Sequence, residues 1–297
     1  MKLIESKAEY IPQEEGLEGI YKMIELAGRT AYHSQDKITP TSAKDFVDRM
    51  IKSKHGAALE HGTVYLKFKD LADNDVVRYI ENHYSAVGKE LCVSSNLRVL
   101  QENNWLDDLQ YLCSPTEFHE KRYTMRFTCS RAIAQELTRH RTFSFLMESQ
   151  RYINYSKERH GGEITFIIPS WLDCKEMRVK NGNSGIYILT DGVTIGEINK
   201  GKPFIHYLAA QEEMYFKLLQ QGKQPQQARD VLPNATKTEL IMTGFASDWR
   251  YLLDIRYYAK TGKPHPDMEN LMLKAQEVMQ EVDIWEDIMS KPSKFKE

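Results

Sequence analysis

A basic cluster in the middle of the chain carries the strongest functional signal. Residues 139–141 are Arg-His-Arg, and an apolar run, 143–147, follows almost at once. A folded protein places such cations in a pocket mainly where something anionic compensates their charge. Ser149 and Arg151 come next, and a serine hydroxyl with an arginine fork is typical of phosphate sites. The residue types alone therefore predict a local anion-binding site.

The elements before the cluster indicate how it is positioned. Alternating apolar residues predict a strand over 123–129, and Ser130 is a suitable N-cap for a helix that leads into residues 139–141. Successive helical residues point about 100° apart, so three neighbours on one helix cannot share a ligand face. Either the three side chains fan around a large ligand, or the helix ends before them. The following Phe143-Ser144-Phe145, a poor helix interior, favours the second alternative.

Helical and strand patterns are mixed along the whole chain. Amphipathic helices are predicted over 43–55, 204–221 and 267–289, and short strands over 64–68 and 164–168. No linker divides the sequence. We therefore expect a single α+β domain over 1–297, with a central sheet flanked by long helices. The Asn- and Gly-rich stretch 180–203 reads as an insertion or an exposed loop.

Bulk composition limits the class of protein. The chain has 297 residues, 41% hydrophobic, with a net charge of -2. A mildly acidic protein is a poor general nucleic-acid binder, and no stretch is long and apolar enough for a membrane span. Residues 1–7 lack the pattern of a signal peptide, so we expect a cytoplasmic protein. The four cysteines show no zinc spacing, and no metal site is expected.

Other candidate residues leave alternatives open. Arg229 and Arg256 stand on apolar helical segments. The simpler interpretation is an ion pair with Asp230 or Asp254; alternatively, both arginines close the anion site. Cys113 has no basic neighbour in sequence to lower its pKa, which favours an inert thiol. Glycine-rich nucleotide loops are absent from the sequence, so an ordinary dinucleotide or P-loop domain is not expected.

The order of these motifs resembles that of a known family. Arg139-His140-Arg141, seven residues, then Ser149 is similar to the signature of the flavin-dependent thymidylate synthases. Further segments resemble the family in the same order: Leu59-Glu60-His61, Arg131 to Leu137, Gln227 to Pro233, and Ala246 to Arg256 followed by His265. The resemblance covers about residues 20–290 and implies a single catalytic domain with insertions near 84–120 and 180–203.

This resemblance implies a function. Family members methylate dUMP at C5 to give dTMP, with methylenetetrahydrofolate as carbon donor, NADPH as reductant and FAD as the redox relay. They are homotetramers whose active sites form where subunits meet. The cofactor carries the difficult redox step, so no protein nucleophile is needed. The expected partners are therefore small molecules and further copies of the chain, with no nucleic acid and no membrane.

The resemblance also assigns residues. FAD is expected to contact Arg139, His140 and Arg141, with His265 as a flavin neighbour. The residues expected to bind dUMP are Glu136, Arg139, Glu148, Ser149, Gln150, Arg151, Arg229 and Arg256. Among these, Ser149, Gln150 and Arg151 hold the phosphate, and Arg256 is the catalytic residue that favours negative charge on the uracil ring. Met147 stands where many relatives have a polar residue, and Glu148 is a candidate to compensate.

Two other functions are open. One is a relative that still binds flavin but has lost catalysis through the change at Met147. The other is a non-enzymatic protein that binds RNA or another polyanion with the same arginines. The first would be yellow when purified, and the second colourless.

Overall fold

A long antiparallel strand pair forms the middle of the molecule. The computed structural model describes residues 1–69, 75–157, 161–181, 186–190, 193–197 and 202–295. β6 (Arg122–Ser130) pairs with β12 (Lys237–Phe245) over their full lengths, from Lys237 opposite Ser130 to Phe245 opposite Arg122. β2 (Lys7–Tyr10) and β7 (Ser144–Met147) complete a four-stranded sheet in the order β2-β6-β12-β7.

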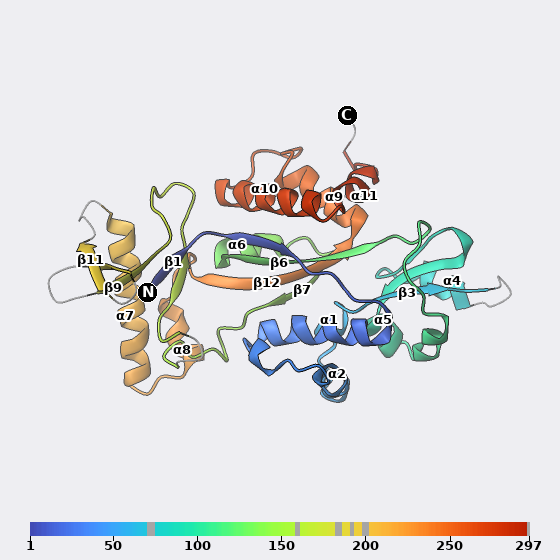
Figure 1. Cartoon of the computed structure of the whole chain (residues 1–297), viewed down its shortest axis with the longest axis horizontal. Helices are drawn as coiled ribbons and strands as arrows, with labels where there is room; N and C mark the ends of the chain where they lie inside the picture. The colour runs from blue at the N-terminus through green and yellow to red at the C-terminus, as the bar shows by residue number, and fades with distance from the viewer. Residues whose placement is uncertain (70–74, 158–160, 182–185, 191–192, 198–201, 296–297) are drawn as a thin grey trace.

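Helices cover both faces of this sheet. α1 (Gly16–Ala31) and α2 (Ser42–Lys52) lie on one side, and α9 (Ala246–Arg256), α10 (Pro266–Glu281) and α11 (Trp285–Ser290) on the other (Figure 1). Phe127, Met242 and Trp249 belong to the core between the sheet and α9–α11. Each large apolar side chain buried there contributes about 1.5–3 kcal/mol. The expected α+β class, a central sheet flanked by long helices, is confirmed.

Two smaller sheets extend the molecule at either end of the strand pair (Figure 1). One has the order β11-β10-β9-β1-β8, and the other β3-β5-β4. The elements of the first end are β1 (Lys2–Ile4), β8 (Thr165–Ile167), β9 (Met177–Asn181), β10 (Ile186–Thr190), β11 (Val193–Glu197), α7 (Pro203–Gln220), α8 (Pro225–Ala228) and η5 (Arg229–Val231). Those of the second are α3 (Gly56–Leu59), β3 (Thr63–Lys67), α4 (Asp75–Ile80), β4 (Ala86–Val87), η2 (Lys89–Leu91), β5 (Cys92–Asn96), α5 (Leu97–Glu102) and η3 (Leu106–Tyr111).

Two sequence predictions of local structure were wrong. The stretch 180–203 contains β10 and β11, which continue the antiparallel order from β9, so its described part is not a simple exposed loop. Residues 182–185, 191–192 and 198–201 lie outside the described residues. The helix expected over 267–289 is two helices, because Asp283 adopts a left-handed conformation (φ 58°) that a continuous helix does not permit. The interpretation of 84–120 and 180–203 as insertions stays a prediction.

Candidate active site

Helix α6 (Arg131–Leu137) delivers the basic cluster. The Ser130 hydroxyl accepts a hydrogen bond from the Ile133 backbone N–H at 3.3 Å, so the predicted N-cap is confirmed. The helix ends at Leu137, and residues 139–141 lie in the turn between α6 and β7. Of the two alternatives for the triplet, the structure therefore shows the second. In this turn Arg139 and Arg141 are exposed, and His140 is half-buried.

Arg256 is brought to the same place by α9, whose last residue it is. Its Nε donates to His140 Nε2 at 3.2 Å, and its Nη1 donates to Glu136 Oε2 at 3.3 Å. Because His140 Nε2 accepts, the imidazole is neutral in this arrangement. Burial, followed by the Arg256 charge, lowers the pKa of His140 to about 4. Glu136, His140 and Arg256, called here the Arg256 cluster, are three predicted site residues in direct contact.

The alternative pairing of Arg256 with Asp254 is not what the fold shows. Asp254 is fully buried, faces Arg250 at 3.3 Å and accepts from the Ser293 hydroxyl at 2.7 Å. Arg256 instead faces Glu136, and their side chains are 20% and 35% exposed. An ion pair this open to water contributes little to stability. Arg256 is therefore available to a ligand at a small energetic cost.

The segment after β7 holds the other predicted residues. Glu148 is buried and its Oε2 accepts from Lys237 Nζ at 3.0 Å and from the Glu239 N–H at 3.2 Å. Burial alone would lower the pKa of Lys237, but Glu148 and Glu239 outweigh it and raise that pKa. The Glu148 carboxylate is thus engaged inside the protein. The exposed Arg151 guanidinium lies 5.5 Å from the centre of the Tyr152 ring.

Arg131 is a candidate that sequence reasoning missed. The backbone N–H of Arg131 donates to the Thr236 carbonyl oxygen at 3.0 Å. This bond connects the segment that follows η5, which begins with Arg229, to the start of α6. Burial lowers the pKa of Arg131, and the positive charge of Arg229 lowers it further. In the described part of the chain, neither arginine forms an ion pair, so Arg229 does not pair with Asp230 as the simpler interpretation held.

Two buried donors at this end also lack partners. Arg131 Nη1 and the Gln150 amide nitrogen Nε2 are both shielded from water with no hydrogen-bond partner among the described residues. Arg131 and Gln150 both lie near the Tyr155 side chain, and Arg229 lies near Arg131. Two neighbouring guanidinium groups without an ion pair form a place where an anion would be stabilised. We call Arg131, Gln150 and Arg229 the Arg131 cluster. The only sequence signal for Arg131 was its position directly after Ser130, the N-cap of α6.

His265 stands apart from both clusters. It is the N-cap of α10, and its Nδ1 accepts from the Asp267 N–H at 3.1 Å. Between the end of α9 and the start of α10 lies an open groove of about 850 Å³, lined by residues that include Tyr257, Tyr258 and Pro266. Arg256 is next in sequence to Tyr257, and His265 is next to Pro266, so both lie beside residues that line the groove.

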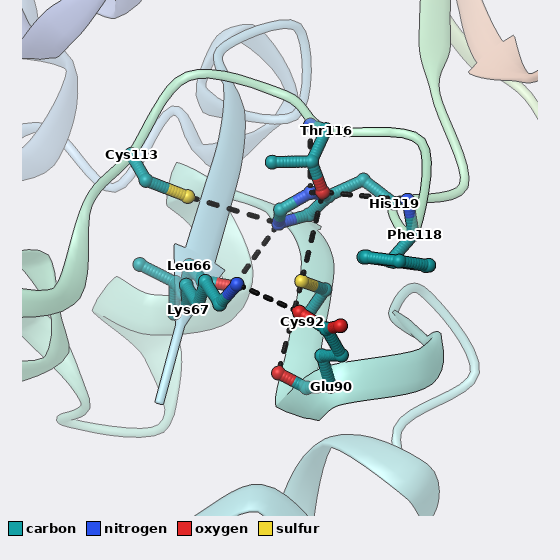
Figure 2. A network of polar contacts seen from close by, with 8 residues as sticks. All are labelled: Leu66, Lys67, Glu90, Cys92, Cys113, Thr116, Phe118 and His119. Atoms are coloured by element: carbon teal, nitrogen blue, oxygen red, sulfur yellow. Dashed lines mark hydrogen bonds and ion pairs between the residues drawn. The ribbon is translucent and has the colours of Figure 1, made fainter. Parts of the chain in front are cut away.

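A cysteine and a histidine lie together elsewhere, in a network that Figure 2 shows from close by. Cys113 Sγ is 3.8 Å from His119 Nε2, so the thiol has a basic neighbour that the sequence did not reveal. The Thr116 N–H donates to His119 Nδ1 at 3.0 Å, which leaves the proton on Nε2, facing Leu66 O at 3.1 Å. The imidazole therefore cannot take the thiol proton, and burial raises the pKa of Cys113. The expectation of an inert thiol holds.

Within the described ranges, no three His, Cys, Asp or Glu side chains gather closely enough to hold a metal ion. Among the helices of those ranges, none is both long and apolar enough to cross a bilayer.

Comparison with known proteins places this site in a family. The sequence profile of the thymidylate synthase complementing protein family matches residues 67–283, which include both clusters. The chain belongs to this family of enzymes.

Its relatives include named enzymes. It is 23% identical to the flavin-dependent thymidylate synthase of Corynebacterium aurimucosum over 269 residues, 86% of this chain and 78% of that protein. It is 31% identical to that of Corynebacterium efficiens over 148 residues, and 29% identical to that of Mycobacterium tuberculosis H37Rv over 140 residues. Each of these two matches covers 47% of this chain and 49%, about half, of the relative.

Solved structures overlay on the chain loosely. The UMP/dUMP methylase PolB from Streptomyces cacaoi, bound with 5-Br dUMP, aligns over 98% of this chain and 97% of its own, with 16% identity and a TM-score of 0.45. Thymidylate Synthase X from Helicobacter pylori, with FAD and dUMP, aligns over 97% of this chain and 99% of its own, with 16% identity and a TM-score of 0.38.

Proposed function

We propose that this protein is a flavin-dependent thymidylate synthase that converts dUMP to dTMP, with methylenetetrahydrofolate as carbon donor and NADPH as reductant. The observation that carries the proposal is the Arg256 cluster, in which a guanidinium from α9 meets a neutral imidazole and a carboxylate from the α6 end. Family membership supplies the reaction class, and this cluster supplies the group that the reaction needs.

The chemistry at the uracil ring explains the choice of an arginine. C5 of uracil is a poor nucleophile until the ring gains negative charge. Arg256 cannot act as a base, but its fixed charge stabilises negative charge on the ring as it develops. His140 stays neutral at pH 7 because its pKa is lowered to about 4, so it does not add a second cation beside Arg256. Glu136 is the group that holds Arg256 until the base displaces it.

The Arg131 cluster fits the nucleotide phosphate. Arg131 Nη1 and Gln150 Nε2 are donors that have no acceptor among the described residues, and Arg229 forms no ion pair there. Ser149 and Arg151, next to Gln150 in the chain, add a hydroxyl and an exposed guanidinium. Glu148, expected from sequence to contact the substrate, supports this end by holding Lys237. A phosphate dianion would replace the repulsion between the two guanidinium groups by attraction.

The exposed arginines of the turn fit the cofactor. The side chains of Arg139 and Arg141 form no hydrogen bond or ion pair within the described ranges, as expected of groups that hold the diphosphate of FAD. His265, across the α9–α10 groove, would lie beside the flavin. When bound, the flavin would supply the hydride transfer, and the protein residues bind and orient the reactants around it.

The two clusters face different directions, which bears on assembly. Arg131 and Glu136 are five residues apart on α6, so their side chains point about 140° apart around the helix axis. One copy of the chain would then present two half-sites. The proposed homotetramer lets the Arg131 cluster of one subunit and the Arg256 cluster of another enclose the same nucleotide.

Tritium release tests the proposal. The purified protein, supplied with NADPH, methylenetetrahydrofolate and dUMP tritiated at C5, is expected to release tritium to water and to form dTMP. A yellow protein that releases none would be the inactive flavin-binding relative. A colourless protein that also takes up no FAD but binds RNA would be the polyanion binder.

A further inference from the structure

A second cavity lies far from both clusters, at the opposite end of β6. It has a volume of about 190 Å³ and is lined by the ends of β2 and β6, the start of α1, β3 and the segment after η3. β6 spans nine residues, so this end is about 27 Å from α6 along the strand. None of the site residues predicted from the sequence lines it.

The walls of the cavity are mainly aromatic and apolar. Tyr10, Tyr65 and Tyr123 line it, together with Ile20 and Leu112. The Tyr10 and Tyr123 rings pack edge to face with their centres 6.4 Å apart. The volume is below the range of about 300–1,000 Å³ that drug-sized ligands occupy. The space therefore suits a single planar ring rather than a nucleotide.

Most polar groups of the lining are already used inside the protein. The Gln13 amide bonds the Thr63 backbone through both of its ends at 2.8 Å. The Tyr123 hydroxyl donates to Asp287 at 2.7 Å, and the Ser114 hydroxyl donates to Glu15 at 2.8 Å. These groups shape the cavity but have little left to offer a ligand.

The unused polar atoms are donors. The Tyr65 hydroxyl accepts from the Arg122 N–H at 2.9 Å, and its own proton has no acceptor among the described residues. Burial raises the pKa of Tyr65 to about 12, so it keeps that proton at neutral pH. Arg122 Nε is buried and lacks a hydrogen-bond partner in the same part of the chain. A ligand of this cavity should therefore bring an acceptor oxygen.

The cavity lining carries two cations and two carboxylates, so its formal charge is balanced. Arg122 forms no ion pair in the described ranges; its Nη atoms donate to Glu60 O, Ser95 O and other neutral oxygens. Two carboxylates, Glu14 and Glu15, lie at the rim, but Lys22 pairs with Glu14 at 2.8 Å in a solvent-exposed contact. Lys121 is a second cation of the lining.

We propose that this cavity is a second ligand site, separate from the arginine clusters, that binds a small aromatic monocarboxylate between Tyr10 and Tyr65. The ring packs against the tyrosines, and the carboxylate accepts from the Tyr65 hydroxyl near the positive charge of Arg122. The site does not depend on the proposed reaction, because none of its groups belongs to the Arg256 or Arg131 cluster.

Binding of benzoate to the full-length protein tests this site. We expect benzoate to bind more tightly than benzylamine, which reverses the charge, and than cyclohexanecarboxylate, which lacks the flat ring, when each is titrated by calorimetry. Tyr65→Phe should weaken benzoate about five-fold, the effect of one lost hydrogen bond. Tyr111→Phe, a tyrosine outside the cavity, should leave the affinity unchanged.

Two further measurements locate the binding and do not depend on the Tyr65 variant. Ser114→Trp, a change at the exposed rim, should abolish benzoate binding without unfolding the protein. Benzoate should slow alkylation of Cys113, which lines the cavity, and leave that of Cys174 unchanged. Equal affinity for benzoate and benzylamine, or benzoate binding that survives Ser114→Trp, would overturn the proposal.

Discussion

The arginines around the three-stranded sheet differ from those around α6. Near β3-β5-β4, Arg78 pairs with the buried Asp108, and Arg98 pairs with Glu60 and Glu102. Around α6, four arginines form no ion pair in the part of the chain that the structure describes: Arg131, Arg139, Arg141 and Arg229. The side chains are similar, but Arg78 and Arg98 have matching carboxylates and these four arginines do not.

The difference separates stabilising arginines from ligand-binding ones. A guanidinium that has a buried carboxylate adds to folding, and its removal leaves an uncompensated charge. A guanidinium beside another cation costs stability until an anion arrives. The pairing of each arginine therefore predicts whether its removal should lower stability or lower ligand affinity.

The largest expected effect is on turnover. Arg256→Ala should reduce kcat by about 10²–10³-fold, because it removes the charge that stabilises the developing anion. Loss of the partly exposed ion pair with Glu136 should lower folding stability by at most about 0.5 kcal/mol. Arg250 lies on the same helix but faces the buried Asp254. Arg250→Ala should therefore lower folding stability and have little effect on kcat. Turnover and thermal melting of both variants check this; comparable losses of stability and activity in Arg256→Ala would make it a structural arginine.

The second prediction contrasts Arg78 with Arg131. Arg78→Ala should lower the free energy of unfolding by about 3 kcal/mol, because Asp108 is only 6% exposed and loses its cation. Arg131→Ala should be neutral or slightly stabilising without ligand, since it relieves repulsion with Arg229, and should weaken dUMP binding. Denaturant unfolding measures the free energy of unfolding of both variants, and titration measures their affinity for dUMP. A large stability loss in Arg131→Ala would contradict the distinction.

The third prediction concerns pH. His61 is fully buried beside Thr243, and burial, then Arg122, lowers its pKa to about 3 from an unfolded value near 6.5. Between these values the unfolded state binds more protons, so stability falls as pH decreases. From pH 7 to 5 this group should cost about 2 kcal/mol.

Unfolding of two matched variants at pH 7 and pH 5 isolates the contribution of His61 to the pH dependence of stability. His61→Asn should remove about that much of the pH dependence, whereas His55→Asn, at an exposed histidine, should not. An unchanged slope in His61→Asn would show that the buried imidazole is not the group that titrates.

The smallest expected effect is on dUMP affinity. Arg151→Lys should weaken dUMP binding about ten-fold, because an ammonium cannot reproduce a bidentate fork. Arg49→Lys is the matched control, since Arg49 is also exposed and also lies over an aromatic ring, that of Phe46. Isothermal titration compares the two, and equal affinities would remove Arg151 from the phosphate end.

Local patterns predicted the elements that lead to the site. The alternation over 123–129 and the Ser130 cap depend on neighbours in sequence, and both are confirmed. The contact between Arg256 and His140 joins residues 116 apart, so only the family resemblance could place them together. Arg131 was missed because nothing near it in sequence shows that Arg229 lies beside it. Cys113 and His119 are only six residues apart, but no periodic pattern over this loop predicts that their side chains meet.

The visible absorption spectrum of the untreated, purified protein tests the main idea most directly. If the arginines around α6 lack partners because they hold a flavin and a nucleotide, the protein should show bound flavin, and adding dUMP should shift its bands. A colourless protein that takes up no FAD on titration, and whose melting temperature does not change with dUMP, would contradict the account.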